Sequence, residues 1–351
     1  MTPASLRPIV IDARAAARAR IGGVERWAIE MAARLPARRP GAYVVARPPR
    51  ALAHRAGHAW EQLWLPAAAA ARRTGLVFAP ANLAPVLWPR SVVVVHDVAA
   101  LRHPEWYSSA YVAWQRWVLP RLARRALHLI TVSEFSRREI VEELDVDPDR
   151  VSVVPGGVDG RFAAMQDPAA VRRRLGLPEA YVLTLGTDNL RKNRAALSAA
   201  AHQLQEQGIA LVAAGAGRSY MRPQPAADGL VDVGYVRDED LPGLYRAARA
   251  FVLPSRDEGF GLPCLEAMAA GTPVVAAASG GVPEACGDAA LLVDPDDQDA
   301  IAHAVVAAAT APDLRERLRA AGRRRAAQLT WDRTAEMVDA LLATVLAGRG
   351  R

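Results

Sequence analysis

Short apolar runs alternate with longer segments of helical periodicity along the whole chain. The runs are four to six residues long, rich in Val, Ile and Leu, and bounded by Gly, Pro or Asp. Such runs predict buried strands, and strands that alternate with helices predict parallel sheets in an α/β fold. The predicted strands are 8–12, 43–47, 76–79, 92–96, 127–132, 181–186, 211–215, 250–253, 274–277 and 291–294.

The alternation of strands and helices stops and restarts near the middle of the chain, which indicates two domains. A length of 351 residues suits two domains of ordinary size. We predict an N-terminal domain over 1–166, a C-terminal domain over 167–330, and a terminal amphipathic helix in 331–351 that crosses back to the first domain. Asp299 is expected to cap the helix that begins near it.

The stretch 250–283 holds the clearest candidate site. A buried strand leads into a loop with Gly259 and Gly261, and Pro263 then opens a helix. A ligand can approach a glycine backbone closely, and the free N–H groups at the helix start suit a phosphate or a sugar hydroxyl. Glu258 and Glu266 stand on either side of this turn, and carboxylates accept hydrogen bonds from vicinal hydroxyls.

The segment EGFGLPCLEAMAAGTPVVA, residues 258–276, resembles the signature of the retaining glycosyltransferases of family four, of the group 1 type. The resemblance implies the GT-B fold, in which two Rossmann-like domains face a central cleft that binds a nucleotide-diphosphate sugar. It also implies that Glu266 holds the ribose hydroxyls. Glu258 and the N–H groups around Phe260, Gly261 and Leu262 would hold the sugar.

A second turn, 187–193, carries Arg191 and Lys192 directly after a predicted strand. Two cations at a strand-to-helix turn are placed to hold a diphosphate. Lys192 is the only lysine in a chain that otherwise uses Arg, so codon bias does not explain it. Many family members have Arg where Thr187 stands, and we expect Arg191 to supply that charge here.

Three further sites follow from the resemblance. It implies that Gly22 and Gly23 lie against the donor diphosphate and the acceptor, and that the backbone near Val236 contacts the nucleotide base. His96 and Asp97 end a strand of four valines, where α/β proteins gather their ligands. The resemblance places His96 near the transferred sugar.

Composition and charge narrow the classes of protein. No apolar run is long enough to span a bilayer, and the first residues lack a signal-peptide layout. We therefore expect a cytoplasmic protein that is peripheral on the inner face of the membrane. Two cysteines form neither a disulfide framework nor a metal motif. A dinucleotide fingerprint needs a glycine at position 220, which is Tyr220, so the oxidoreductase class lacks its motif.

The positive charge is concentrated in the N-terminal half. Residues 1–166 hold 23 Arg and 14 Asp or Glu, a net charge of +9, while the remainder holds 21 basic and 23 acidic residues, a net charge of −2. This distribution favours an anionic partner, which we take to be a membrane surface and not a nucleic acid. A GC-rich genome that uses Arg freely is the simpler alternative.

We therefore predict a retaining, metal-independent glycosyltransferase without a cofactor. It would move a hexose, with mannose favoured, from a nucleotide-diphosphate sugar to a glycan, lipid-linked or other acceptor. The preference for GDP-linked mannose rests on the turn 187–193. Its sequence is similar to that of the corresponding turn in mannosyltransferases of surface-polysaccharide assembly. Two alternatives stay open, namely a nucleotide-sugar epimerase or hydrolase of the same fold and a non-catalytic, basic membrane-associated protein.

Overall fold

The computed structural model describes residues 8–49, 57–164, 167–215, 217–224 and 227–348, and its contacts divide the chain into two units. Unit 1 comprises the chain up to Arg102, Val112–Pro155 and the segment from Trp331 onward. Unit 2 comprises His103–Tyr111 and Gly156–Thr330. Residues 103–111 and 156–166 thus group with unit 2, whereas the sequence-based division places them in the first domain.

Unit 1 is built on a six-stranded parallel sheet in the order β2-β1-β3-β4-β5-β6. Its strands are β1 (Ile9–Asp12), β2 (Tyr43–Ala46), β3 (Leu76–Ala79), β4 (Ser91–Val94), β5 (His128–Thr131) and β6 (Val151–Val153). Its helices are α1 (Gly23–Arg38), α2 (Gly57–Ala59), α3 (Leu65–Ala71), α4 (Ala99–Arg102), α5 (Ser109–Arg125, whose first turn groups with unit 2), α6 (Glu134–Leu144) and α14 (Trp331–Ala347). The sequence predicted the first five strands and not β6.

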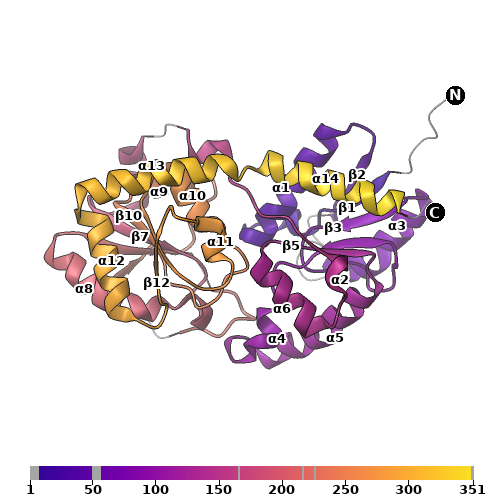
Figure 1. Ribbon diagram of the computed structural model, residues 1–351, viewed down its shortest axis with the longest axis horizontal. Coiled ribbons are helices and arrows are strands. Elements are labelled where there is room, and N and C mark those ends of the chain that lie inside the picture. The colour runs from indigo at the N-terminus through magenta and orange to yellow at the C-terminus, as the bar shows by residue number, and fades with distance from the viewer. Residues whose placement is uncertain (1–7, 50–56, 165–166, 216, 225–226, 349–351) are drawn as a thin grey trace. The chain divides into compact units, whose positions relative to one another are not determined.

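Both faces of this sheet are covered, which is why its strands are mainly apolar and do not alternate between apolar and polar residues. Val93 and Leu129 pack with α5 and α6 on one face. On the other face, Trp27 of α1 contacts Phe78 of β3 at a ring distance of 6.4 Å. The last helix, α14, runs along α1, and its Trp331 lies edge-on to Trp27 at 6.3 Å (Figure 1).

Unit 2 repeats the design with a second six-stranded parallel sheet, in the order β12-β11-β10-β7-β8-β9. Its strands are β7 (Tyr181–Leu185), β8 (Ala210–Ala214), β9 (Leu230–Asp232), β10 (Ala250–Leu253), β11 (Val274–Ala277) and β12 (Leu291–Val293). Its helices are α7 (Pro168–Leu175), α8 (Ser198–Glu206), α9 (Leu241–Ala247), α10 (Leu262–Ala270), α11 (Val282–Cys286), α12 (Gln298–Thr310) and α13 (Pro312–Gln328). The α/β, Rossmann-like fold predicted from the sequence is therefore confirmed.

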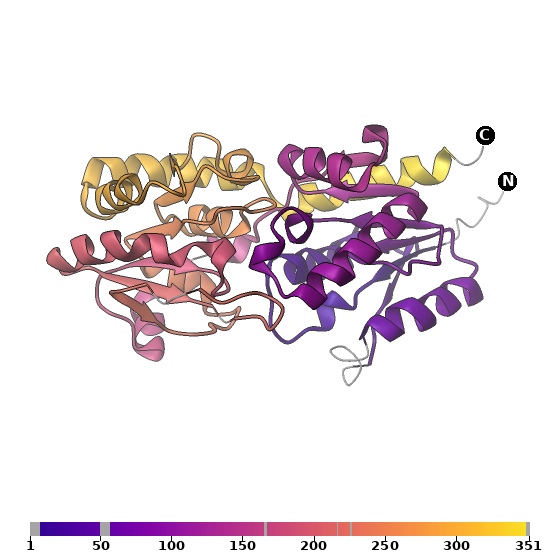
Figure 2. The same cartoon turned by 90° about the horizontal axis from the view of Figure 1, so that it is seen from below.

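Alternate residues of the unit 2 strands face opposite layers of helices, and the layer that contains α8 faces the viewer in Figure 2. Val182, Leu211 and Val252 pack with α8 and α12. Phe251 points the other way and meets Tyr245 of α9 at a ring distance of 5.3 Å. Because the strands are parallel, the loops that follow them gather at one edge of the sheet.

One sequence prediction about helix α12 is wrong. Asp297, not Asp299, caps this helix, because the Asp297 side chain accepts a hydrogen bond of 2.9 Å from the backbone N–H of Ala300. Asp299 lies in the first turn, where a negative charge still favours the helix dipole. Both residues suit a helix start, and only the backbone geometry distinguishes them.

Across the described ranges of the chain, no helix combines the length and the apolar character needed to cross a bilayer.

Candidate functional site

The loop between β10 and α10 presents Glu258 at the carboxyl edge of the unit 2 sheet. Gly261 caps α10, which begins at Leu262, one residue before Pro263, and Gly271 ends it. The loop after β11 holds Glu258 from the side, since the N–H of Gly281 donates to the Glu258 carbonyl at 2.8 Å. Gly280 makes this approach possible, because a Cβ there would lie 2.2 Å from the same carbonyl oxygen.

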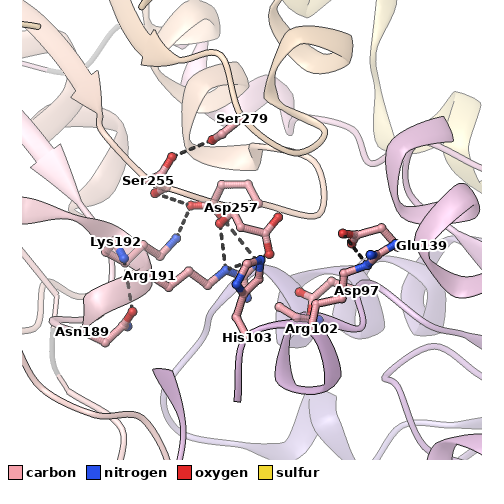
Figure 3. A network of polar contacts seen from close by, with 12 residues as sticks. Asp97, Arg102, His103, Glu139, Asn189, Arg191, Lys192, Ser255, Asp257 and Ser279 are labelled. Atoms are coloured by element: carbon pink, nitrogen blue, oxygen red, sulfur yellow. Dashed lines mark hydrogen bonds and ion pairs between the residues drawn. The ribbon is translucent and has the colours of Figure 1, made fainter. Parts of the chain in front are cut away.

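The Glu258 carboxylate is buried and bound on several sides. The Ser255 hydroxyl donates to its Oε1 at 2.6 Å. The Ser279 hydroxyl in turn donates to the Ser255 carbonyl at 2.6 Å, which fixes the start of the loop. Lys192 completes the set by an ion pair of its Nζ with the same Oε1 (Figure 3).

Lys192 and Arg191 come from the short turn Leu190–Lys192 that follows β7, the neighbour of β10 in the sheet. Asn189 caps this turn, because its side chain accepts from the Lys192 N–H at 3.2 Å. The Arg191 Nε donates to the Asp257 carbonyl at 2.8 Å, and its Nη2 lies 3.8 Å from Glu258. The two cations therefore point toward the Glu258 loop (Figure 3).

The charges keep Glu258 ionised in spite of its burial. Burial alone would raise the pKa of a carboxyl, but the Lys192 and Arg191 charges outweigh it and hold the pKa of Glu258 below its ordinary value. The site thus places two cations and one carboxylate within a single buried network. Two neighbouring cations of this kind attract negatively charged ligand groups.

Tyr107 is part of the same network, and sequence reasoning did not identify it. Its hydroxyl lies 3.2 Å from Nη1 of Arg191, and both side chains are buried. The segment that carries it pairs with residues near Met221, since Ser108 N–H donates to the Tyr220 carbonyl at 2.9 Å. No local pattern marks this pairing, because it joins segments more than 100 residues apart in the sequence.

The remaining predicted residues of unit 2 lie around α10 and beyond β9. Glu266 is buried in α10 and accepts a hydrogen bond of 3.0 Å from the Tyr245 hydroxyl, so its partners differ from those of Glu258. Phe260 is buried, and Leu262 is the first residue of α10. Val236 is buried in the segment between β9 and α9.

His96 and Asp97 lie in unit 1, after β4, as the sequence predicts. The ring Nε2 of His96 lies 3.0 Å from the Pro80 carbonyl, so Nε2 carries a proton and donates. Burial lowers the pKa of His96 although that hydrogen bond opposes it, and the ring is neutral at pH 7. Asp97 accepts from the N–H of Ala99 at 3.2 Å, which places it at the start of α4.

Gly22 and Gly23 form the start of α1, also in unit 1. Gly22 is the cap residue and Gly23 the first residue of the helix. The Gly22 N–H donates to Glu25 at 3.0 Å, and Arg18 binds the other oxygen of that carboxylate at 2.8 Å. The structure therefore assembles Glu258, Lys192 and Arg191 in unit 2 and places Gly22, Gly23, His96 and Asp97 in unit 1.

No group of three His, Cys, Asp or Glu side chains with the spacing of a metal site occurs in the described part of the chain. The two cysteines, Cys264 and Cys286, are reduced and buried. Two effects raise the pKa of Cys264 well above its ordinary value: the larger is its hydrogen bond with Cys286, and the second is its burial. Such a thiol is a poor nucleophile at neutral pH.

Comparison with known proteins agrees with this architecture. Residues 169–325 match the family model "Glycosyl transferases group 1", and residues 57–161 match "Glycosyltransferase Family 4". The Escherichia coli O-antigen chain mannosyltransferase B is 33% identical over 258 residues, which cover 69% of this chain and 67% of that protein. The D-inositol 3-phosphate glycosyltransferase of Streptomyces scabiei is 35% identical over 237 residues, which cover 61% of this chain and 53% of that protein.

The alignment thus spans only about half of the length of the Streptomyces scabiei relative. Among solved structures, Anabaena Alr3699/HepE in complex with UDP-glucose matches 96% of this chain and 99% of that chain with a TM-score of 0.75 and 18% identity. A likeness at that identity concerns the fold alone. Taken with the matched motifs and the two parallel sheets, these similarities show that the chain has the GT-B fold and belongs to the group 1 glycosyltransferases of family four.

Proposed function

We propose that this glycosyltransferase moves a hexose from a nucleotide-diphosphate sugar, with retention of configuration and without a metal ion. The observation that carries the proposal is the network of Lys192, Arg191 and Glu258 at the carboxyl edge of the unit 2 sheet. It joins two cations that suit a diphosphate to a carboxylate that suits sugar hydroxyls. Retention rests on the family resemblance.

In this proposal the diphosphate competes with Glu258 for Lys192. The Lys192–Glu258 ion pair opens when the donor binds, and Lys192 and Arg191 then face the diphosphate oxygens. Negative charge grows on these oxygens as the sugar leaves, and fixed cations in a buried site stabilise such charge strongly. The released Glu258 carboxylate accepts hydrogen bonds from the sugar hydroxyls. The two cations supply the charge that a metal ion would otherwise provide.

The other predicted residues take the roles that the family resemblance implies. Glu266 holds the ribose hydroxyls, and the Val236 backbone contacts the base. The N–H groups of Phe260, Gly261 and Leu262 bind the sugar. In unit 1, His96 and Asp97 act on the sugar, and Gly22 and Gly23 on the diphosphate and acceptor.

A GDP-linked mannose is the donor we favour, because the Escherichia coli relative is a mannosyltransferase of O-antigen chains. The acceptor in this proposal is a glycan or a lipid-linked glycan. A lipid-linked glycan is anchored in a membrane, so with this acceptor the protein would work at the inner face of the cell membrane. The basic N-terminal half supports this location.

The test is the thermal unfolding midpoint in the presence of GDP, UDP, ADP or NADH, each with and without a chelator. Binding to the native state raises the midpoint by mass action. The proposal predicts a rise with one nucleoside diphosphate that the chelator leaves unchanged and that Glu266→Ala abolishes. A rise with NADH alone would refute the proposal. In a separate activity assay with the donor, release of free sugar without transfer to an acceptor would favour the hydrolase alternative.

A further inference from the structure

We propose that one surface of unit 1 binds an anionic lipid bilayer by inserting apolar side chains between lipid headgroups. This inference deepens the membrane partner of the proposed function, on which it rests. We name the surface the Trp117 surface. Its apolar members are Leu63, Trp64, Leu87 and Trp117, and its cationic members are Arg116, Arg121, Arg124 and Arg125.

The apolar members are the most exposed large hydrophobic side chains in the described part of the chain. Leu87 and Leu63 are 77% and 74% exposed, and Trp64 and Trp117 are 48% and 47% exposed. Three other exposed hydrophobic residues lie in unit 2 at 37–42%, on or beside the two edge strands of its sheet. Large apolar side chains that are exposed in this way mark an interaction site when they gather in one place.

Side-chain contacts connect the three segments that carry the four apolar members. The Gln62 side chain donates to the Ala84 carbonyl at 2.9 Å and accepts from the Val86 N–H at 2.8 Å. Leu63 and Leu87 are the next residues after Gln62 and Val86, so they flank the same junction. Trp64 also stacks on Trp60 at 5.2 Å.

Helix α5 joins the same junction. The His58 ring meets the Trp114 ring edge-on at 6.0 Å, and Trp114 stacks on Trp117 at 5.4 Å. Arg125, at the end of α5, lies 3.5 Å from the Val86 carbonyl through its Nη1. The segments 57–64, 84–88 and 114–125 therefore form one continuous surface.

Cations lie directly beside the apolar members. The Arg121 guanidinium covers the Trp117 ring at 4.7 Å, and Arg121, Arg124 and Trp117 lie on one helix face by their spacing. No acidic residue is available to neutralise them on these segments. Between positions 57 and 90 the sequence has only Glu61, which is buried against Arg14 at 3.1 Å, and between 109 and 125 it has none.

This combination matches an anionic bilayer better than a nucleic acid. Tryptophan and leucine side chains beside arginines are typical of helices and loops that lie in the headgroup region. Phosphate contacts with a nucleic acid would use the arginines and would leave two exposed leucines without a partner. Each arginine near an anionic surface strengthens binding by roughly fivefold.

The experiment is co-sedimentation of the full chain with vesicles of phosphatidylcholine alone or mixed equally with phosphatidylglycerol. The test variants are Leu87→Ser with Trp117→Ser, and Arg121→Glu with Arg124→Glu. The controls in unit 2 are Leu292→Ser, which changes an exposed apolar side chain, and Arg317→Glu with Arg324→Glu on α13, which changes two exposed cations. Thermal stabilisation by nucleoside diphosphate is measured on every variant.

We expect binding to the mixed vesicles that salt weakens, a loss of about tenfold or more in both test variants, and wild-type binding in both controls. Nucleoside diphosphate should stabilise all variants equally, which separates this inference from the proposed donor site. Equal vesicle binding by the test and control variants would overturn the inference. So would binding of RNA, but not of vesicles, by the wild-type protein.

Discussion

The hydroxyl of Tyr107 lies 3.2 Å from Nη1 of Arg191, although 84 positions separate the two residues in the sequence. Arg191 is also held by the Asp257 carbonyl at 2.8 Å, so hydrogen bonds fix both its Nε and its Nη1. Tyr107 thus acts as a positioning residue for a cation that we place on the donor diphosphate. It belongs to unit 2 through the backbone pairing of its segment.

Replacing Tyr107 by Phe should lower kcat by roughly tenfold, because a hydrogen bond to a charged group is lost while the ring stays in place. The KM for the donor should change much less, since Lys192 is untouched. Steady-state kinetics on the purified variant would show this split.

The matched control is Tyr181→Phe. It removes another buried tyrosine hydroxyl of unit 2, one that donates to the Leu244 carbonyl at 2.6 Å and not to any atom of the Glu258 network. We expect Tyr181→Phe to lower the thermal midpoint and to leave kcat near the wild-type value. A kcat that falls equally in both variants would show that Tyr107 acts only through stability.

The lowered pKa of Glu258 predicts a loss of stability in acid. The stability that its ionised form contributes is complete above the ordinary carboxyl pKa of 4.5 and is lost as the pH falls toward the lower pKa of the folded protein. The thermal midpoint should therefore fall more steeply below pH 4.5 in the wild-type protein than in Glu258→Gln. Identical slopes in this range would contradict the ion pairs with Lys192 and Arg191.

Gly280→Ala should displace the Glu258 loop. Gly280 has φ of +57°, and a Cβ would lie 2.2 Å from the Glu258 carbonyl. Gly208→Ala is the control, because Gly208 has φ of +69° with nothing within 4 Å of its Cβ position. We expect about 1 kcal/mol of destabilisation from backbone strain alone in Gly208→Ala. Gly280→Ala should lose more stability in urea unfolding and also its stabilisation by nucleoside diphosphate.

Asp297→Ala should lower the free energy of unfolding by about 1 kcal/mol, because it removes the cap of α12. Asp299→Ala changes only a charge in the first turn and should cost less than half of that. Urea unfolding of both variants would decide the order. A larger loss in Asp299→Ala would mean that the cap lies where the sequence pattern first placed it.

The strands that the sequence predicted carry a continuous apolar run, and most of them are buried along their length. Strands β6 (VSV) and β9 (LVD) are three residues long and each contains a polar residue, so they do not stand out from loops, whereas the equally short β12 (LLV) is entirely apolar. The Asp297 cap shows a second limit, since two aspartates fit the same helix start and the sequence does not rank them. Local pattern therefore identifies elements better than it identifies their ends.

In the candidate site, too, some residues could be predicted from the sequence and others could not. Glu258, Arg191 and Lys192 each follow a predicted strand, so local pattern and parallel pairing bring them to one edge. Ser255 was open to prediction as well, since it stands three residues before Glu258 in the same loop. Tyr107 was not, because its place depends on backbone pairing with a distant segment of irregular structure.

The proposed reaction depends above all on Lys192, which we propose binds the diphosphate of the donor. The most direct test is the equilibrium dissociation constant of the nucleoside diphosphate that stabilises the protein, measured by titration calorimetry for wild type and Lys192→Met. The control is Arg256→Met, which removes a neighbouring exposed cation that pairs with Asp296 at 3.1 Å. We predict that Lys192→Met weakens binding by about tenfold or more, while Arg256→Met leaves it unchanged. Equal dissociation constants for wild type and Lys192→Met would contradict the claim.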